Sequence, residues 1–153
     1  ALSAADVTLL KTKGLRLTGY SVTLTEIKVP GAGAAETVLM DTPTVLPAGW
    51  GGSVRMDAAN GFDVSVFAGC TTSTVFTVYL TDSAENPQLQ IKDGSWTTLV
   101  SANDPASGWD GVDLAADQTV YSFSLDDNDL ATLKSGGMII GGQNTTVAKV
   151  TMK

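Results

Sequence analysis

The stretch DLATLKSGGMIIGGQNTTVAKVTM, residues 129–152, decides the fold. Its first part predicts one helical turn, because Leu130 and Leu133 stand three positions apart and two glycines follow them. Its second part predicts a short apolar strand at 138–140, a glycine bend, and a longer strand at 145–152. A single helical turn between strands is typical of a protein built mainly of β-strands.

Strand patterning recurs along the rest of the chain, at roughly ten-residue spacing and between turns rich in Gly, Pro, Asn and Asp. In each segment apolar residues occupy every second position, so that one face is core and the other is free for water or ligand. The clearest segments are 62–67, 75–80, 88–91 and 120–125. The sequence therefore predicts an all-β protein, a β-sandwich (jelly roll) of two antiparallel sheets.

An internal repeat divides the chain. Residues 6–29 align without gaps onto residues 129–152, Asp6 falling on Asp129 and Lys11 on Lys134. Three parts are predicted: 1–29, the closing strands of an upstream repeat; 30–35, a small-residue linker; and 36–153, one complete module. Because two strands cannot bury a core alone, we expect 1–29 to dock on the module or to swap strands with a neighbouring module.

Composition excludes several classes of function. The 153 residues carry a formal net charge of −7, which disfavours nucleic acid as a partner. The chain has no His and one Cys, so His-dependent catalysis, His-based metal sites and internal disulfides are excluded. No apolar run is long enough for a membrane helix. The abundance of Gly, Ser and Thr favours a secreted or cell-surface bacterial protein, with any leader removed or upstream.

The segment PQLQIKDGSW, residues 87–96, carries the best functional clue. Gln88 and Gln90 alternate with apolar residues, so both amides lie on one face of the predicted strand. An aromatic ring beside amide donors and acceptors suits a sugar, whose C–H faces stack on indole while its hydroxyls form hydrogen bonds. A half-buried structural Trp96 with solvated glutamines is the alternative.

Two hairpin registers are open for Trp96. A two-residue loop pairs it with Ile91 and turns it into the core, whereas a three-residue loop pairs it with Lys92 and adds it to the glutamine face. The second register also places Leu99 opposite Leu89 on the buried side. We therefore predict that Gln88, Gln90 and Trp96 share a surface.

Five more residues are candidates for the binding site. Trp50, among glycines, is either an exposed platform or a core plug, and composition favours the plug. Arg55 points away from the core, and Trp109 lies on a polar loop of the kind that forms binding rims. Tyr79 lies opposite the apolar positions of its strand, and Gln143 supplies either a ligand contact or a turn.

The acidic residues do not indicate catalysis. Asp126, Asp127 and Asp129 cluster at the start of the helix predicted over 127–133, where the helix dipole explains them. Asp110 and Asp113 are candidate ligands of a structural calcium ion, although their spacing matches no known calcium loop. A module of this size leaves little room for the cleft of a glycosidase, so no enzyme, no catalytic residue and no required cofactor are predicted.

Several motifs taken together resemble a known family. They are ETVLMDTPTVLPAGWGG (36–52), FAGC (67–70), VFTVYLTD (75–82), PQLQIKDGSW (87–96) and residues 121–152. In this order they resemble the β-jelly-roll carbohydrate-binding modules attached to bacterial plant-polysaccharide-degrading enzymes, in particular the β-glucan and xyloglucan binders of family sixty-five. The resemblance covers 36–153, and residues 6–29 resemble the closing part of the same family.

The resemblance implies a concave sheet that binds internal stretches of a β-glucan through Trp and Gln side chains, here Trp96 with Gln88 and Gln90, together with Trp50 and Trp109. It also implies a non-catalytic role, in which the module holds an appended glycoside hydrolase on cellulosic, mixed-linkage or xyloglucan substrates. A structural or adhesive β-sandwich in a bacterial surface assembly is the alternative.

Overall fold

The computed structural model describes residues 36–104 and 107–153. The predicted upstream remnant (1–29) and linker (30–35) lie outside the described residues. The described residues belong to the predicted complete module, 36–153.

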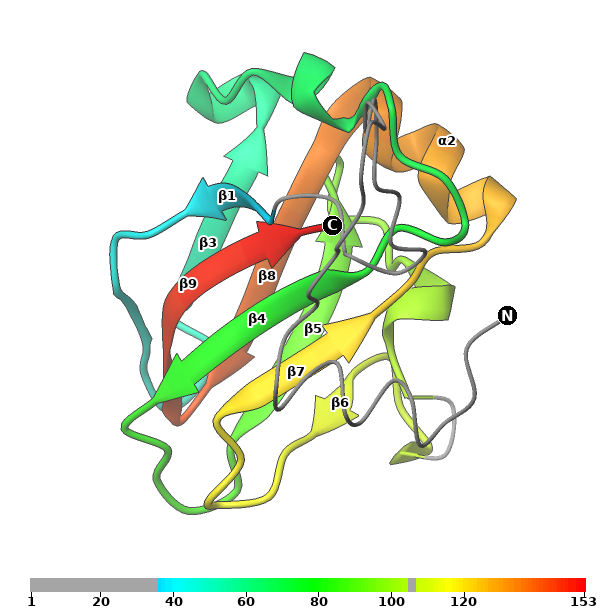
Figure 1. Cartoon of the computed structure of the whole chain (residues 1–153). Helices are drawn as coiled ribbons and strands as arrows, with labels where there is room; N and C mark the ends of the chain where they lie inside the picture. The colour runs from blue at the N-terminus through cyan, green and yellow to red at the C-terminus, as the bar shows by residue number, and fades with distance from the viewer. Residues whose placement is uncertain (1–35, 105–106) are drawn as a thin grey trace, which may run out of the picture. The chain divides into compact units, whose positions relative to one another are not determined.

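Two antiparallel sheets form the module, and they lie as two layers with β9, β4 and β7 in front of β8 and β5 (Figure 1). The first sheet has the order β1 (Thr37–Met40), β9 (Thr145–Met152), β4 (Phe76–Thr81) and β7 (Val120–Phe123), and β2 (Thr44–Leu46) also pairs with β9. The second sheet has the order β3 (Gly52–Asp57), β8 (Gly137–Gln143), β5 (Gln88–Asp93) and β6 (Val112–Asp113). The predicted β-sandwich is confirmed.

The quoted stretch 129–152 supplies an inner strand to each sheet. β8 pairs with β3 and β5, and β9 pairs with β1, β2 and β4. The chain crosses from one sheet to the other at Asn144, which has a left-handed φ of 58° and donates its side-chain N–H to the carbonyl of Glu85 at 2.7 Å. Asn tolerates this conformation better than most residues, which explains its place at the crossing.

The predicted helix is present and slightly longer than expected. Helix α2 spans Asp127–Gly136, and the Asp126 side chain caps it by accepting a hydrogen bond from the backbone N–H of Asp129 at 2.9 Å. Leu130 and Leu133 are buried. Asp127 and Asp129 lie in the first turn, as the helix dipole favours.

The core fills the space between the sheets with the alternate residues of their strands. Each inner strand therefore places one face in the core and leaves the other to the outside. The fully buried core side chains include Phe76, Leu89, Ile91, Ile140, Val147 and Val150.

The strand predicted at 62–67 is wrong. Val64–Phe67 forms a short 3₁₀ helix, because the Asp63 carboxylate accepts a hydrogen bond from the backbone N–H of Ser65 at 3.0 Å and turns the chain. Phe62 and Phe67 stack with their ring centroids 5.6 Å apart. The alternate apolar residues Phe62, Val64 and Val66 are half-buried against the core, although the backbone over 64–67 is helical and not extended.

Among the described residues, no helix combines the length and the apolar character needed to cross a membrane.

Candidate ligand-binding face

The outer face of the second sheet is built from three rows of side chains that cross β3, β8 and β5. The first row is Arg55, Ile139 and Lys92; the second is Ser53, Gly141 and Gln90; the third is Gln143, Gln88 and Asp113 on β6. The rows follow from the registers, because residues paired across antiparallel strands point to the same side. Predicted residues from distant parts of the chain therefore meet on one surface.

The middle row forms the floor of an open hollow of ≈ 380 Å³. Its residues have small or flexible side chains, and a Cβ atom added at Gly141 would meet only the carbonyl oxygen of Gln90, at 3.9 Å. The glycine bend predicted at 141–142 is wrong, because both glycines lie within β8, and Gly141 forms part of this floor. The hollow is lined by Trp50, Gly51, Gly52, Ser53, Gln90, Lys92, Trp96 and Gly141.

Trp96 stands at one end of the hollow and is 48% exposed. The predicted pairing of Trp96 with Lys92 is wrong, because Lys92 bridges to Thr98 and Trp96 lies within the loop. Its φ is 67°, and its backbone N–H donates to the carbonyl of Asp93 at 3.0 Å. Trp96 nevertheless lies on the glutamine side of the sheet, since Gln90 lines the same hollow.

The turn before Trp96 is fixed by the Asp93 carboxylate and by a close approach of two backbones. Asp93 Oδ1 accepts hydrogen bonds from the backbone N–H groups of Ser95 and Thr97, at 2.8 and 2.9 Å. A Cβ at Gly94 would lie 2.0 Å from the carbonyl oxygen of Gly136. Because the approach of Gly94 to Gly136 involves the last residue of α2, the spacing of residues 87–96 alone could not predict the register of this hairpin.

Arg55 supports Trp96 from β3. Its guanidinium carbon lies 5.2 Å from the centroid of the Trp96 ring, and two of its nitrogens donate to the Asp57 carboxylate at 2.7 and 3.0 Å. This hydrogen bonding raises the pKa of Arg55 and, with help from Asn60, lowers the pKa of the buried Asp57. Arg55, predicted as a ligand contact, is thus placed beneath the aromatic platform and is held there by an ion pair.

Trp50 and Trp109 mark the other end of the face. Their ring centroids are 5.4 Å apart with planes at 81°, an edge-to-face contact. Trp50 is 39% exposed and has a φ of 62°, so the core-plug interpretation is wrong and the platform interpretation holds. Trp109 lies directly over Gly111, where a Cβ would fall 2.1 Å from the indole ring.

The third row links these two tryptophans through side-chain hydrogen bonds. The backbone N–H of Gly49 donates to Gln143 Oε1 at 3.1 Å, and Gln143 Nε2 donates to Gln88 Oε1 at 2.6 Å. Asp113 Oδ1 then accepts from Gln88 Nε2 at 2.7 Å and from the indole N–H of Trp109 at 3.3 Å. This amide bridge, Gln143–Gln88–Asp113, joins the loop that carries Trp50 to the ring of Trp109.

The predicted glutamines have two different roles: two belong to the amide bridge, and one does not. Gln88 and Gln143 use their amides to hold the loops, whereas no hydrogen bond of the Gln90 amide is found within the described part of the chain. Gln90 lines the hollow. Its free donor and acceptor are available to a ligand.

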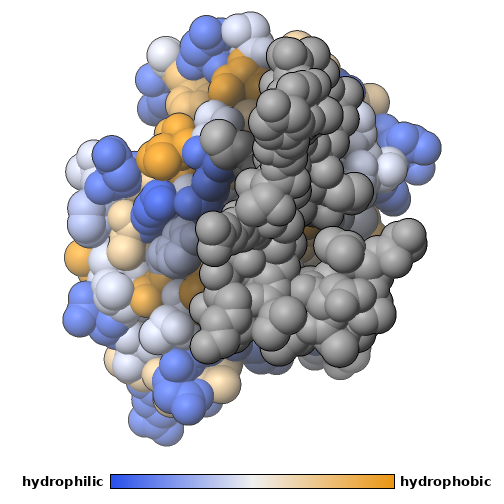
Figure 2. Space-filling model, in the orientation of Figure 1, coloured by the Kyte–Doolittle hydropathy of each residue, from blue (hydrophilic) through white to orange (hydrophobic). Residues whose placement is uncertain are grey.

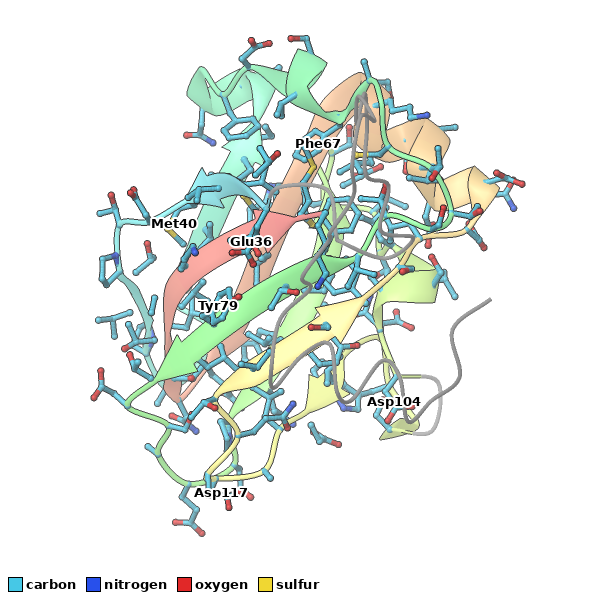
Figure 3. The ribbon with its side chains drawn as sticks, viewed as in Figure 1. Glu36, Met40, Phe67, Tyr79, Asp104 and Asp117 are labelled. Carbon is cyan, nitrogen blue, oxygen red and sulfur yellow. The ribbon has the colours of Figure 1, made fainter. Side chains whose placement is uncertain are left out.

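Tyr79 lies elsewhere, on the first sheet. Its hydroxyl donates to Glu36 Oε1 at 2.8 Å, and both residues are labelled in Figure 3. Lys149 lies over the Tyr79 ring, and Thr151 donates to the same carboxylate at 2.6 Å. Hydrogen bonds from Thr151, Tyr79 and Lys149 lower the pKa of Glu36. Over the described residues visible in Figure 2, hydrophobic side chains on this side are scattered among hydrophilic ones.

The two candidate calcium ligands, Asp110 and Asp113, lie in different surroundings. Asp113 belongs to the amide bridge, and Asp110 lines a different hollow. In the segments 36–104 and 107–153 no three acidic or Cys side chains gather as a metal site would require.

Comparison with known proteins gives a structural likeness without a sequence relative. No protein family and no curated protein matches this sequence. One similar solved structure is a Bacteroides ovatus mixed-linkage glucan utilization locus protein, SGBP-B, in complex with a mixed-linkage heptasaccharide. The likeness has a TM-score of 0.56 at 21% identity and covers 77% of this chain and 28% of that one. The present chain thus spans under a third of that protein's length, and the likeness supports the β-sandwich fold.

Proposed function

We propose that the outer face of the second sheet binds a polysaccharide, namely internal stretches of β-1,4 or mixed-linkage glucan, including cellulosic glucan and xyloglucan. The observation that carries the proposal is the pair of exposed tryptophans, Trp50 and Trp96, lining one hollow whose floor is Ser53, Gly141 and the free amide of Gln90. Indole faces take the C–H faces of sugar rings, and the amide takes their hydroxyls.

The chemistry of the hollow favours a neutral sugar chain over a reaction. Its lining residues include no carboxylate. Hydrolysis of a glycosidic bond requires two carboxyl groups placed on either side of it. Stacking and amide hydrogen bonds require no cofactor, so the proposed role is non-catalytic.

The comparison supports the proposed ligand class. The similar Bacteroides ovatus protein was solved with a mixed-linkage heptasaccharide, and this chain shares its fold over 77% of its length. In the proposed setting the module works at the cell surface or outside the cell, where it keeps an appended glycoside hydrolase close to its substrate. Such tethering raises the effective concentration of enzyme at the polysaccharide.

Affinity electrophoresis in gels containing mixed-linkage glucan, xyloglucan or hydroxyethyl cellulose tests the proposal. The unaltered chain is expected to be retarded by at least one of these, and Trp96→Ala is expected to lose about 2 kcal/mol of binding free energy, as interface aromatics do. Tyr79→Ala is the matched control, because it removes an aromatic ring from the other sheet. Free migration in all three gels, or equal retardation of a folded Trp96→Ala variant, contradicts the proposal.

A further inference from the structure

A second hollow, of ≈ 260 Å³, is lined in part by Trp109. We propose that it is a second sugar subsite, which takes the next part of the same glycan chain; this inference rests on the proposed function. Its residues come from the connection between β5 and the edge strand β6 of the second sheet. The hollow is lined by Thr98, Val100, Asn103, Asp104, Gly108, Trp109 and Asp110.

Two contacts between lining residues place the second hollow next to the first. Trp109 lines the second hollow and touches Trp50, which lines the first, with ring centroids 5.4 Å apart. Thr98 lines the second hollow and pairs across the β-bridge with Lys92, which lines the first. A polysaccharide that leaves the first hollow over either contact therefore reaches the second.

The walls of the second hollow are held in place before any ligand arrives. Asn103 is buried, and its amide donates to the carbonyls of Ile91 and Leu99 at 3.0 and 2.6 Å while accepting from the N–H of Ile91 at 3.0 Å. The hydroxyl of Ser107 lies 2.9 Å from the carbonyl oxygens of both Trp109 and Gly111. A fixed hollow loses little conformational entropy when it binds a sugar.

The polar groups of the second hollow differ from those of the first. Asp110 is exposed and brings a carboxylate to its rim, whereas the first hollow has the Lys92 ammonium and the Gln90 amide. Carboxylates accept hydrogen bonds from sugar hydroxyls and repel uronates. The second hollow is thus suited to an uncharged, hydroxyl-rich sugar beside the ring of Trp109.

Isothermal titration calorimetry with mixed-linkage oligosaccharides of three and of six units tests the inference on the full chain. A three-unit ligand fills the first hollow, whereas a six-unit ligand reaches both. The unaltered protein is therefore expected to bind the six-unit ligand about tenfold more tightly, the gain in affinity that about one hydrogen bond to a charged group supplies. In Asp110→Ala most of this gain is expected to disappear, while the three-unit affinity is retained.

Asp117→Ala is the matched control, because it removes the same charge from an exposed turn, which Figure 3 shows apart from Asp104. Backbone amide shifts of Gly108 in NMR spectra, expected with the six-unit ligand alone, provide a readout that does not depend on affinity. Equal affinity for both lengths, or an Asp110→Ala variant that keeps the length dependence, overturns the second subsite while leaving the first intact. Absence of binding at either length overturns the proposed function as well.

Discussion

The two ends of the ligand-binding face hold their tryptophans by different chemistry. At one end Trp96 lies over Arg55, which is held by an ion pair with the buried Asp57. At the other end Trp50 and Trp109 contact each other and are linked by the amides of Gln143 and Gln88 and the carboxylate of Asp113. The same function, presenting an indole ring, thus depends on an ion pair and a cation–π contact at one end and on a chain of hydrogen bonds at the other.

The largest effect is expected from blocking the hollow between the two ends. In Gly141→Leu the new side chain enters the hollow, since its Cβ position is open, and both tryptophans lose access to one sugar chain. The affinity for mixed-linkage glucan is expected to fall about 30-fold or more, equivalent to a hot-spot loss of about 2 kcal/mol. Calorimetry measures the change.

Ser122→Leu serves as the control for this block, because it places the same side chain on an exposed position of β7 in the other sheet. It is expected to bind glucan as the unaltered chain does. A folded Gly141→Leu variant of undiminished affinity would show that ligand does not use the hollow.

A smaller effect is expected from cutting the amide bridge. Gln143→Ala removes the hydrogen bonds to Gln88 and to the backbone of Gly49, so the Trp50 loop loses its fixed position. The binding free energy is expected to weaken by about 1 kcal/mol, roughly fivefold in affinity, without loss of any direct ligand contact. The near-ultraviolet circular dichroism of the tryptophans is expected to change as well.

Gln118→Ala is the matched control for the bridge, since this glutamine also forms two side-chain hydrogen bonds, here both to backbone groups of a separate turn. It is expected to leave both affinity and circular dichroism unchanged. If Gln143→Ala behaves like Gln118→Ala, the bridge does not position Trp50.

The contact between Trp50 and Trp109 is expected to give a still smaller, non-additive term. In a double-mutant cycle of Trp50→Ala and Trp109→Ala, a coupling of about 0.5 kcal/mol in the free energy of unfolding is expected, the low end for an edge-to-face aromatic pair. Urea unfolding of the four proteins supplies the cycle. Strict additivity would mean that the contact between the two rings adds nothing to stability.

The least effect on affinity, and the clearest effect of pH on stability, is expected at the charged end. The hydrogen bond from Arg55 lowers the pKa of Asp57 in the folded chain below its usual value of 3.8. The ion pair therefore stabilises the folded chain fully above about pH 4, and this stabilisation is lost as the pH falls through the pKa that Asp57 has in the folded chain. Asp57→Asn is therefore expected to be less stable than the unaltered chain at neutral pH, and the difference between their free energies of unfolding is expected to narrow below about pH 4. Urea unfolding at several pH values measures this difference. A difference that does not depend on pH would mean that the carboxylate charge plays no part in stability.

Much of the fold could be predicted because it depends on local patterns. The strands β4, β5 and β9 follow from alternation within each segment, and α2 follows from its Asp cap and closing glycines. The segment 62–67 has the same alternation, yet the Asp63 side chain competes for the backbone and a 3₁₀ helix forms. Periodicity alone cannot detect such competition.

The candidate site could be predicted only in part, because its geometry depends on contacts between distant segments. The sequence places Gln88, Gln90 and Trp96 on one surface. It could not reveal that Gln88 is bound by Gln143, which is 55 positions away, or that Arg55 supports Trp96 from another strand. The role of Gly141 in the floor could not be predicted for the same reason, because the space around its Cα depends on the pairing of β8 with β5.

Trp50 and Trp96 share one further property, a left-handed backbone with φ of 62° and 67°. For a residue with a Cβ this conformation costs roughly 1–2 kcal/mol, and glycine adopts it freely. At these two turns, ligand recognition and thermal stability therefore place opposing demands on the same residue. A Trp96→Gly variant should melt at a higher temperature than Trp96→Ala although neither retains the ring, so an engineer who selects this scaffold for heat resistance alone would tend to remove its binding surface.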